Sequence, residues 1–164
     1  IDGGTKEVMT FGEIYGHGKQ IAILKSVIAK DRIAHAYLFY GMEGVGKRTT
    51  AAVFARALNC AAEDPPCDAC ASCRKAEHKN HPDIVTVAEE GPIIKIGTVK
   101  ELLAQMKFRP REGRMRVFIM PEADRMNPAA ANALLKTLEE PSAGNTLLLT
   151  SARPHALPMT ILSR

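Results

Sequence analysis

The feature that most constrains the fold is a short apolar run that ends in a glycine-rich loop and continues into a helix-forming segment. Residues 36–40 read Ala-Tyr-Leu-Phe-Tyr, which is typical of a buried parallel strand. Residues 41–47 have the spacing G-x-x-x-x-G-K, and residues 47–59 have the apolar pattern of a helix. Strand, loop and helix in this order predict a phosphate-binding P-loop within an α/β fold.

The predicted phosphate cradle combines backbone amides with one lysine. Its residues are Gly41, Gly44, Val45, Gly46 and Lys47, followed by Arg48 and Thr49 at the start of the helix. A P-loop ATPase carries Ser or Thr at the position of Arg48, and that hydroxyl binds Mg²⁺. Arginine cannot ligate a metal ion. Thr49 or Thr50 is a poor substitute, because one residue along a helix turns the side chain by about 100°.

The second half of a P-loop site is altered as well. Residues 117–120 predict another buried strand, and an ATPase needs an Asp after this strand to hold Mg²⁺. Here that position is Pro121, while Glu122 occupies the position of the residue that polarises water. Asp124 is expected to point elsewhere, as a capping or solvated residue. The sequence therefore predicts binding of a nucleotide or phosphate without Mg²⁺-dependent hydrolysis.

The rest of the chain alternates helix and strand. Further strands are predicted at residues 84–87 and 146–150, and helices at residues 20–29 and 98–106. Asn127 followed by Pro128 predicts the start of another helix, which Pro141 stops. Strands separated by helices predict a parallel, doubly wound sheet.

A segment of different composition, residues 60–82, contains all four cysteines. Cys60, Cys67, Cys70 and Cys73 fall within fourteen residues, and this spacing is typical of a closed, structural Zn²⁺ site. Disulfides and free thiols are the alternatives, but disulfides do not suit a chain without a secretion signal. His78 or His81 is a possible replacement ligand, although His81 precedes a proline and suits a loop role better.

Net charge and hydropathy argue against a membrane span but leave binding to nucleic acid open. The formal net charge of +4 permits contact with nucleic acid, but a bound Zn²⁺ with four thiolates would lower it to +2. The basic residues 107–116 are best interpreted as a solvated loop, with phosphate contact as a secondary interpretation. No apolar run approaches the ~20 residues that a membrane span needs, so we expect a cytoplasmic protein. Residues 1–8 are interpreted as a tag or disordered tail, with Met9 as a plausible start.

Several motifs resemble those of one family. Residues 11–17, 35–39, 132–141 and 157–164, together with the cysteine segment, resemble bacterial clamp-loader subunits of DNA polymerase III. The resemblance covers residues 9–164. Arg48 and Pro121 favour the delta-prime type, which has a degraded nucleotide site, over the ATP-hydrolysing gamma/tau type.

The resemblance implies an AAA+ module with a five-stranded parallel sheet flanked by helices, followed by lid and collar domains beyond this chain. It implies that Arg164 is an arginine finger for the ATP of a neighbouring subunit and that Thr150 occupies a sensor position. It also places Ile14, Tyr15 and Gly16 near an adenine ring. The implied partners are gamma/tau and delta subunits in a ring, and through the ring a sliding clamp and primed DNA.

Two other functions remain open from the sequence. One is a gamma/tau-like ATPase in which Thr49 replaces the missing hydroxyl. The other is a zinc-bearing module that binds nucleic acid, for which the charge and the cysteines are the support.

Overall fold

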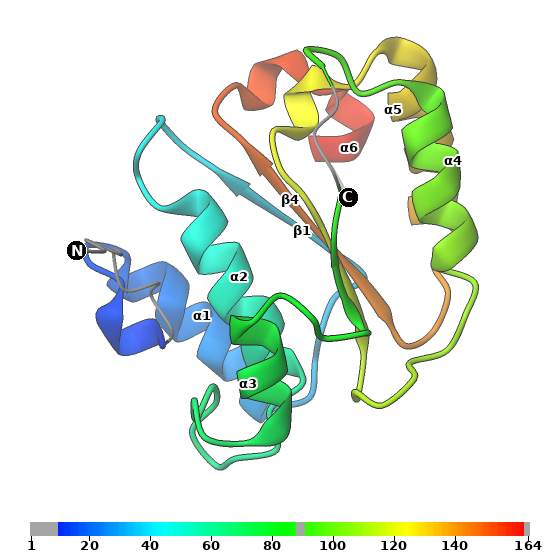
Figure 1. Cartoon of the computed structure of the whole chain (residues 1–164). Coiled ribbons are helices and arrows are strands. Elements are labelled where there is room, and N and C mark those ends of the chain that lie inside the picture. The colour runs from blue at the N-terminus through cyan, green and yellow to red at the C-terminus, as the bar shows by residue number, and fades with distance from the viewer. Residues whose placement is uncertain (1–9, 88–90, 163–164) are drawn as a thin grey trace, which may run out of the picture.

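The structure, a computed structural model, describes residues 10–87 and 91–162 and places a parallel β-sheet between two layers of helices (Figure 1). The sheet has the strand order β1-β4-β3-β2, and each pair of neighbours is parallel. Its strands are β1 (Ala36–Tyr40), β2 (Ile84–Thr86), β3 (Arg116–Met120) and β4 (Asn145–Ser151). The α/β class and the four strands predicted from apolar runs are confirmed, with ends that differ by one residue at most.

Helices cover both sides of the sheet. They are α1 (Gly18–Ala29), α2 (Lys47–Leu58), α3 (Ala71–Glu77), α4 (Ile96–Gln105), α5 (Pro128–Glu139) and α6 (Met159–Leu162). Figure 1 shows α1, α2 and α3 on one side of the sheet and α4 and α5 on the other. The described residues contain no helix with the length and apolarity required to cross a membrane.

The alternation of side chains along β3 explains the two layers. Val117 and Ile119 are buried in a cluster with residues of α1 and α2, whereas Phe118 and Met120 are buried in a cluster with residues of α4 and α5. Successive side chains of a strand point to opposite faces, so a strand that is apolar throughout needs cover on both sides. The two helical layers provide that cover.

Helix α5 begins as its sequence predicts. The side chain of Asn127 accepts a hydrogen bond from the backbone N–H of Ala130 at 2.9 Å, and Pro128 occupies the first helical position. Proline lacks the N–H that would be unsatisfied there. Asn127 and Pro128 together therefore fix where α5 begins.

The expectation of five strands is wrong for the part of the chain that the structure describes. That part contains four apolar runs of strand type, and each of them forms one of the four strands. The number five came from the family resemblance and had no fifth apolar run behind it. Within residues 10–87 and 91–162, β1 therefore lies at an edge of the sheet with β4 as its neighbour.

Candidate functional site

The predicted P-loop lies where the carboxyl ends of three strands meet. The backbone N–H of Gly41, directly after β1, donates to the carbonyl of Ser151 at the end of β4 at 3.2 Å. The backbone N–H of Glu122, beyond the end of β3, donates to the hydroxyl of Thr150 at 3.1 Å. These two bonds bring Gly41, Glu122 and Thr150 to one edge of the sheet, which is where α/β proteins bind ligands.

The loop itself has the geometry of an anion cradle. Gly46 caps the N-terminus of α2 with φ of 88°, a left-handed conformation that favours glycine. The first amides of an α-helix have no acceptor inside the helix, so the N-terminus of α2 (Lys47–Leu58) is of the kind that binds anions. The ammonium group of Lys47 donates to the carbonyls of Gly41 at 2.9 Å and Met42 at 2.7 Å, so it lies folded against the loop. These residues fit a phosphate group.

A histidine outside the motif also contacts the loop. Nε2 of His17 donates to the carbonyl of Val45 at 2.5 Å. His17 is the residue before α1 and follows the segment expected near adenine, in which Ile14 packs against the core and Tyr15 is 91% exposed. The contact links this segment to the phosphate loop. The sequence reading missed it, because 28 residues separate the two partners.

The residues that should bind Mg²⁺ do not fit that ion. Arg48 and Pro121 occupy the two ligand positions, and neither side chain offers a ligand oxygen. Thr50 is only 6% exposed, and its hydroxyl donates to the carbonyl of Gly46 at 2.8 Å. The hydroxyl of Thr50 is therefore already used in a hydrogen bond to the N-cap of α2. Of the two threonines considered as substitutes for the missing magnesium ligand, this leaves Thr49.

Glu122 has an unusual backbone and a nearby cation. Its φ of 50° and ψ of 53° lie in the left-handed region, which is uncommon for residues other than glycine. Its carboxylate accepts a hydrogen bond from the guanidinium of Arg125 at 2.7 Å. The same guanidinium donates to the carbonyls of Gly91 and Pro92, the second of these at 3.2 Å. Arg125 therefore joins Glu122 to the segment that precedes α4.

The side chain of Asp124 is buried and has a structural role. Its carboxylate is 5% exposed, accepts a hydrogen bond from the hydroxyl of Ser151 at 2.7 Å and lies 3.3 Å from the guanidinium of Arg153. Asp124 was expected to point away from the magnesium position as a capping or solvated residue, and the solvated alternative is wrong because its side chain is buried. Its carboxylate instead ties the end of β4 to the turn after β3.

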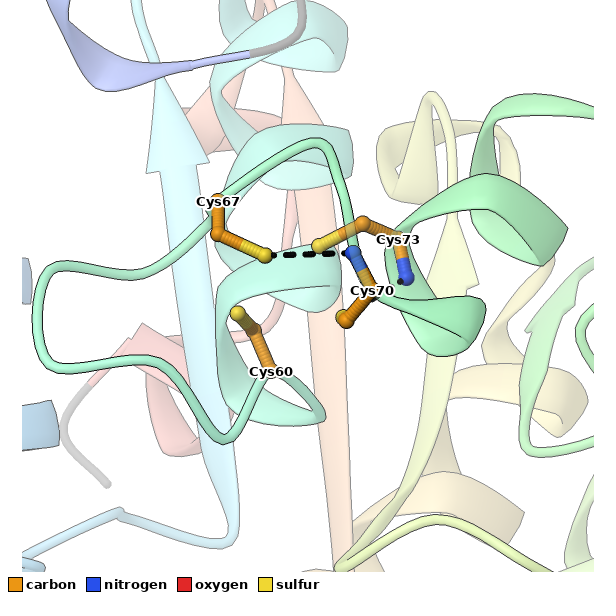
Figure 2. A group of neighbouring side chains, drawn as sticks. All are labelled: Cys60, Cys67, Cys70 and Cys73. Carbon is orange, nitrogen blue, oxygen red and sulfur yellow. Dashed lines mark hydrogen bonds between the residues drawn. The ribbon is translucent and has the colours of Figure 1, made fainter.

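The four cysteines come together as predicted. Cys60 follows α2, Cys67 lies in the next loop, and Cys70 and Cys73 belong to the start of α3. Their sulfur atoms all lie within 4.8 Å of one another and point toward a common centre (Figure 2). A tetrahedron of Zn–S bonds has edges of about 3.8 Å, so a small contraction completes the site. Four thiols in this arrangement can hold a metal ion.

Backbone amides and burial set different acidities within this cluster. The backbone N–H groups of Ala69 and Cys70 lie 3.5 Å and 3.3 Å from the sulfur of Cys67 and lower its pKa to about 6. Burial raises the pKa of Cys60 and of Cys73 above the ordinary value of a thiol. N–H groups directed at sulfur favour the thiolate form that a metal requires.

The two histidines of the segment stay outside the cluster. Nδ1 of His81 accepts a hydrogen bond from the backbone N–H of Asp83 at 3.0 Å, so Nε2 carries the proton and donates to the hydroxyl of Ser72 at 3.0 Å. His81 thus has the loop role favoured by the proline that follows it, and His78 is exposed. The sequence reading missed Ser72 and Asp83, although the run His-Pro-Asp before a strand is a local signal.

Two sets of predicted residues lie outside the described part of the chain. These are Arg164, the expected arginine finger, and residues 1–8, the expected tag or tail. Their roles stay predictions.

Comparison with known proteins identifies the family of this chain. A family model described as DNA polymerase III, delta subunit, matches residues 16–164. The chain is 37% identical over 157 residues to subunit tau/gamma of DNA polymerase III from Haemophilus influenzae. It is 38% identical over 145 residues to subunit delta' from Bacillus subtilis. The two alignments cover 94% and 87% of this chain, but only 23% and 44% of the relatives.

A solved structure gives the same answer for the fold. A gamma subunit-related protein of DNA polymerase III from Thermotoga maritima superposes with a TM-score of 0.64 at 26% identity, over 88% of this chain and 43% of that one. The family model covers most of the chain, and both sequence relatives are more than 30% identical to it. The chain belongs to the family of DNA polymerase III delta subunits.

Proposed function

We propose that this chain is the nucleotide-site domain of a clamp-loader subunit that does not itself hydrolyse ATP, as in the delta-prime type. The observation that carries the proposal is the pair of altered magnesium positions, Arg48 and Pro121, beside a P-loop with normal glycines and Lys47. The AAA+ fold of the family and the relatives in the DNA polymerase III complex support the clamp-loader role.

The chemistry of phosphoryl transfer explains why these two positions decide the matter. Mg²⁺ neutralises charge that develops on the β- and γ-phosphates, and this is worth several kcal/mol in the transition state. A loop without ligands for the ion keeps the amides and Lys47 for binding phosphate. It loses the means of accelerating cleavage.

The catalytic contribution of the subunit would then go to a neighbour. Arg164 is proposed to act as an arginine finger on the ATP of an adjacent gamma/tau subunit, an interaction typically worth about 10³–10⁵ in rate. The proposed partners are gamma/tau and delta subunits in a hetero-oligomeric ring. Through that ring the subunit would help load a sliding clamp on primed DNA.

The cysteine cluster is proposed to hold a structural Zn²⁺. Four sulfur ligands leave no open coordination position, so the ion would contribute folding energy and no catalysis. Cys60, Cys67, Cys70 and Cys73 would be its ligands. Elemental analysis of freshly purified protein is the direct test, and one zinc per chain is the expected result.

The nucleotide proposal is tested by titrating the full-length subunit with a fluorescent ATP analogue, with and without Mg²⁺. We expect the same affinity in both conditions, because the chain offers the ion no ligand. Lys47→Ala is expected to weaken binding in both, since the lysine of a P-loop reaches the phosphates of a bound nucleotide. Binding that depends strongly on Mg²⁺ would contradict the proposal.

A gamma/tau-like ATPase is the second candidate. It is favoured by the intact G-x-x-x-x-G-K spacing and by nearly equal identity to the tau/gamma and delta' relatives. In that case Thr49 would supply the hydroxyl. Thr49→Val would then reduce ATP turnover, whereas the favoured proposal predicts no effect on turnover.

A further inference from the structure

One charged segment is not used by the proposed function. Residues 107–114, called the basic loop here, connect α4 to β3 and contain four cations and one acid. Lys107, Arg109 and Arg111 are exposed, and Phe108 between them is 66% exposed. A loop of this kind is expected to be mobile unless its backbone groups have fixed partners.

A single buried carboxylate supplies those partners. Asp83, just before β2, accepts hydrogen bonds from three successive backbone N–H groups, those of Arg111 at 2.7 Å, Glu112 at 2.9 Å and Gly113 at 2.6 Å. Asp83 is completely buried. A buried carboxylate with three charge-assisted bonds is a strong anchor, because these N–H groups replace the water that it has lost.

The loop approaches this anchor so closely that one position must be glycine. A Cβ atom on Gly113 would lie 2.7 Å from Oδ1 of Asn59 and 3.1 Å from Oδ2 of Asp83. Asn59 makes a second anchor, since its side chain accepts from the backbone N–H of Met115 at 2.9 Å and donates to the carbonyl of Met115 at 3.0 Å. Asp83 therefore holds residues 111–113 of the basic loop, and Asn59 holds Met115, directly after it.

Both anchoring residues, Asn59 and Asp83, are connected to the cysteine cluster. Asn59 is the neighbour of Cys60 in sequence. Asp83 donates its backbone N–H to His81, which donates in turn to Ser72, the neighbour of Cys73. A third contact comes from the same helix, because Lys75 on α3 lies 2.6 Å from the carboxylate of Glu112.

We propose that metal binding by the four cysteines fixes the conformation of the basic loop. The metal holds the end of α2 and the start of α3 together. Asn59, and the hydrogen-bonded series Ser72–His81–Asp83, then hold residues 111–115 in a fixed position relative to these two helix ends. The exposed cations of the loop then share one geometry when the metal is bound and lose it when the metal is removed. This rests on the metal site of the proposed function and not on its nucleotide chemistry.

Hydrogen exchange of the full-length subunit, with zinc bound and after removal by a chelator, tests the coupling. We expect zinc removal to speed exchange of the amides of residues 111–113 by about tenfold or more, because each loses a bond to a charged acceptor. Amides in the centres of β3 and β4 serve as the reference and are expected to stay protected. Zinc content is measured on the same samples.

Two substitutions test which residues couple the metal site to the basic loop. Asp83→Asn keeps the shape of the anchor but not its charge, and is expected to free the loop even when zinc is bound. Ser72→Ala interrupts the path from α3 and is expected to have a smaller effect of the same kind. Glu101→Gln, a matched loss of an exposed carboxylate on α4, is expected to change nothing.

The outcomes separate the coupling from the metal site. Unchanged exchange at residues 111–113 after complete loss of zinc would overturn the coupling and leave the metal site intact. Protein that contains no zinc and takes none up would overturn both. Faster exchange throughout β3 and β4 after zinc removal would also overturn the coupling, because the metal would then support the whole fold rather than the loop.

Discussion

The guanidinium of Arg125 lies 2.7 Å from the carboxylate of Glu122, the residue at the position of the water-polarising base. The arginine is 17% exposed and the glutamate 50% exposed, so the pair lies at the rim of the site. The contact gives the Glu122 carboxylate a structural partner at the edge of the sheet.

Replacement of Arg125 by methionine tests the structural role of this contact. We expect Arg125→Met to lower the free energy of unfolding by about 1–2 kcal/mol, because bonds to Glu122 and to the carbonyls of Gly91 and Pro92 are lost together. Urea unfolding measures the change. Lys136→Met, at an exposed position of α5, is the control and is expected to have little effect. Equal stability of Arg125→Met and the wild type would show that the contacts contribute nothing.

Restoring both magnesium positions should restore a response to the ion. In Arg48→Thr with Pro121→Asp, a hydroxyl and a carboxylate stand where P-loop ATPases have them. We expect nucleotide binding by this double variant to tighten about tenfold or more when Mg²⁺ is added, by analogy with the cost of losing metal-site partners. Arg48→Ala with Pro121→Ala removes the same side chains without adding ligands and should remain insensitive. A double variant without any magnesium response would mean that other features of the loop exclude the ion.

Asp83 predicts a dependence of stability on pH. Burial alone would raise the pKa of its carboxyl, but three backbone N–H groups and the nearby His81 outweigh that effect, so its pKa lies below the usual 3.8. A lowered pKa in the folded state means that the stabilisation is complete above pH 3.8 and is lost as the pH falls through the lower, folded value.

The measurement compares wild type and Asp83→Asn by denaturant unfolding across this range. We expect Asp83→Asn to cost about 2 kcal/mol at pH 7 and the difference to shrink steadily below pH 3.8. A difference that stayed constant as the pH fell would show that the charge of Asp83 is irrelevant to its anchoring role.

The cysteine cluster predicts release of protons on metal binding. Burial raises the pKa of Cys60 and of Cys73, so both are thiols at pH 7 and must ionise to become ligands. We therefore expect zinc binding at pH 7 to release at least two protons, those of these two residues, and to tighten as the pH rises. Calorimetry in buffers of different ionisation enthalpy counts the protons. Binding without proton release would contradict the assignment of Cys60 and Cys73 as ligands.

The sequence predicted the elements that depend on local patterns. The strands, the capped start of α5 and the P-loop followed from apolar runs, Asn127-Pro128 and glycine spacing, and all are in the structure. Convergence of the cysteines also followed, because short spacing limits where the chain can place them. Helix α3 was missed, since its seven residues lie within a segment interpreted only as ligand loops.

Contacts between distant polar residues were beyond the reach of sequence patterns. Asp83 lies 28 to 30 positions from the amides that it binds, and Asn59 lies 56 positions from Met115. No periodicity marks such partners, because tertiary packing brings them together. The same reason explains why the buried position of Asp124 was not foreseen.

The central claim is that this subunit retains a phosphate-binding loop without hydrolysing ATP. Its most direct test is steady-state ATP turnover by the purified full-length subunit, with Lys47→Ala measured in parallel. The account predicts no turnover above background for either protein. Turnover by the wild type that Lys47→Ala abolishes would contradict it and would identify the subunit as an active ATPase.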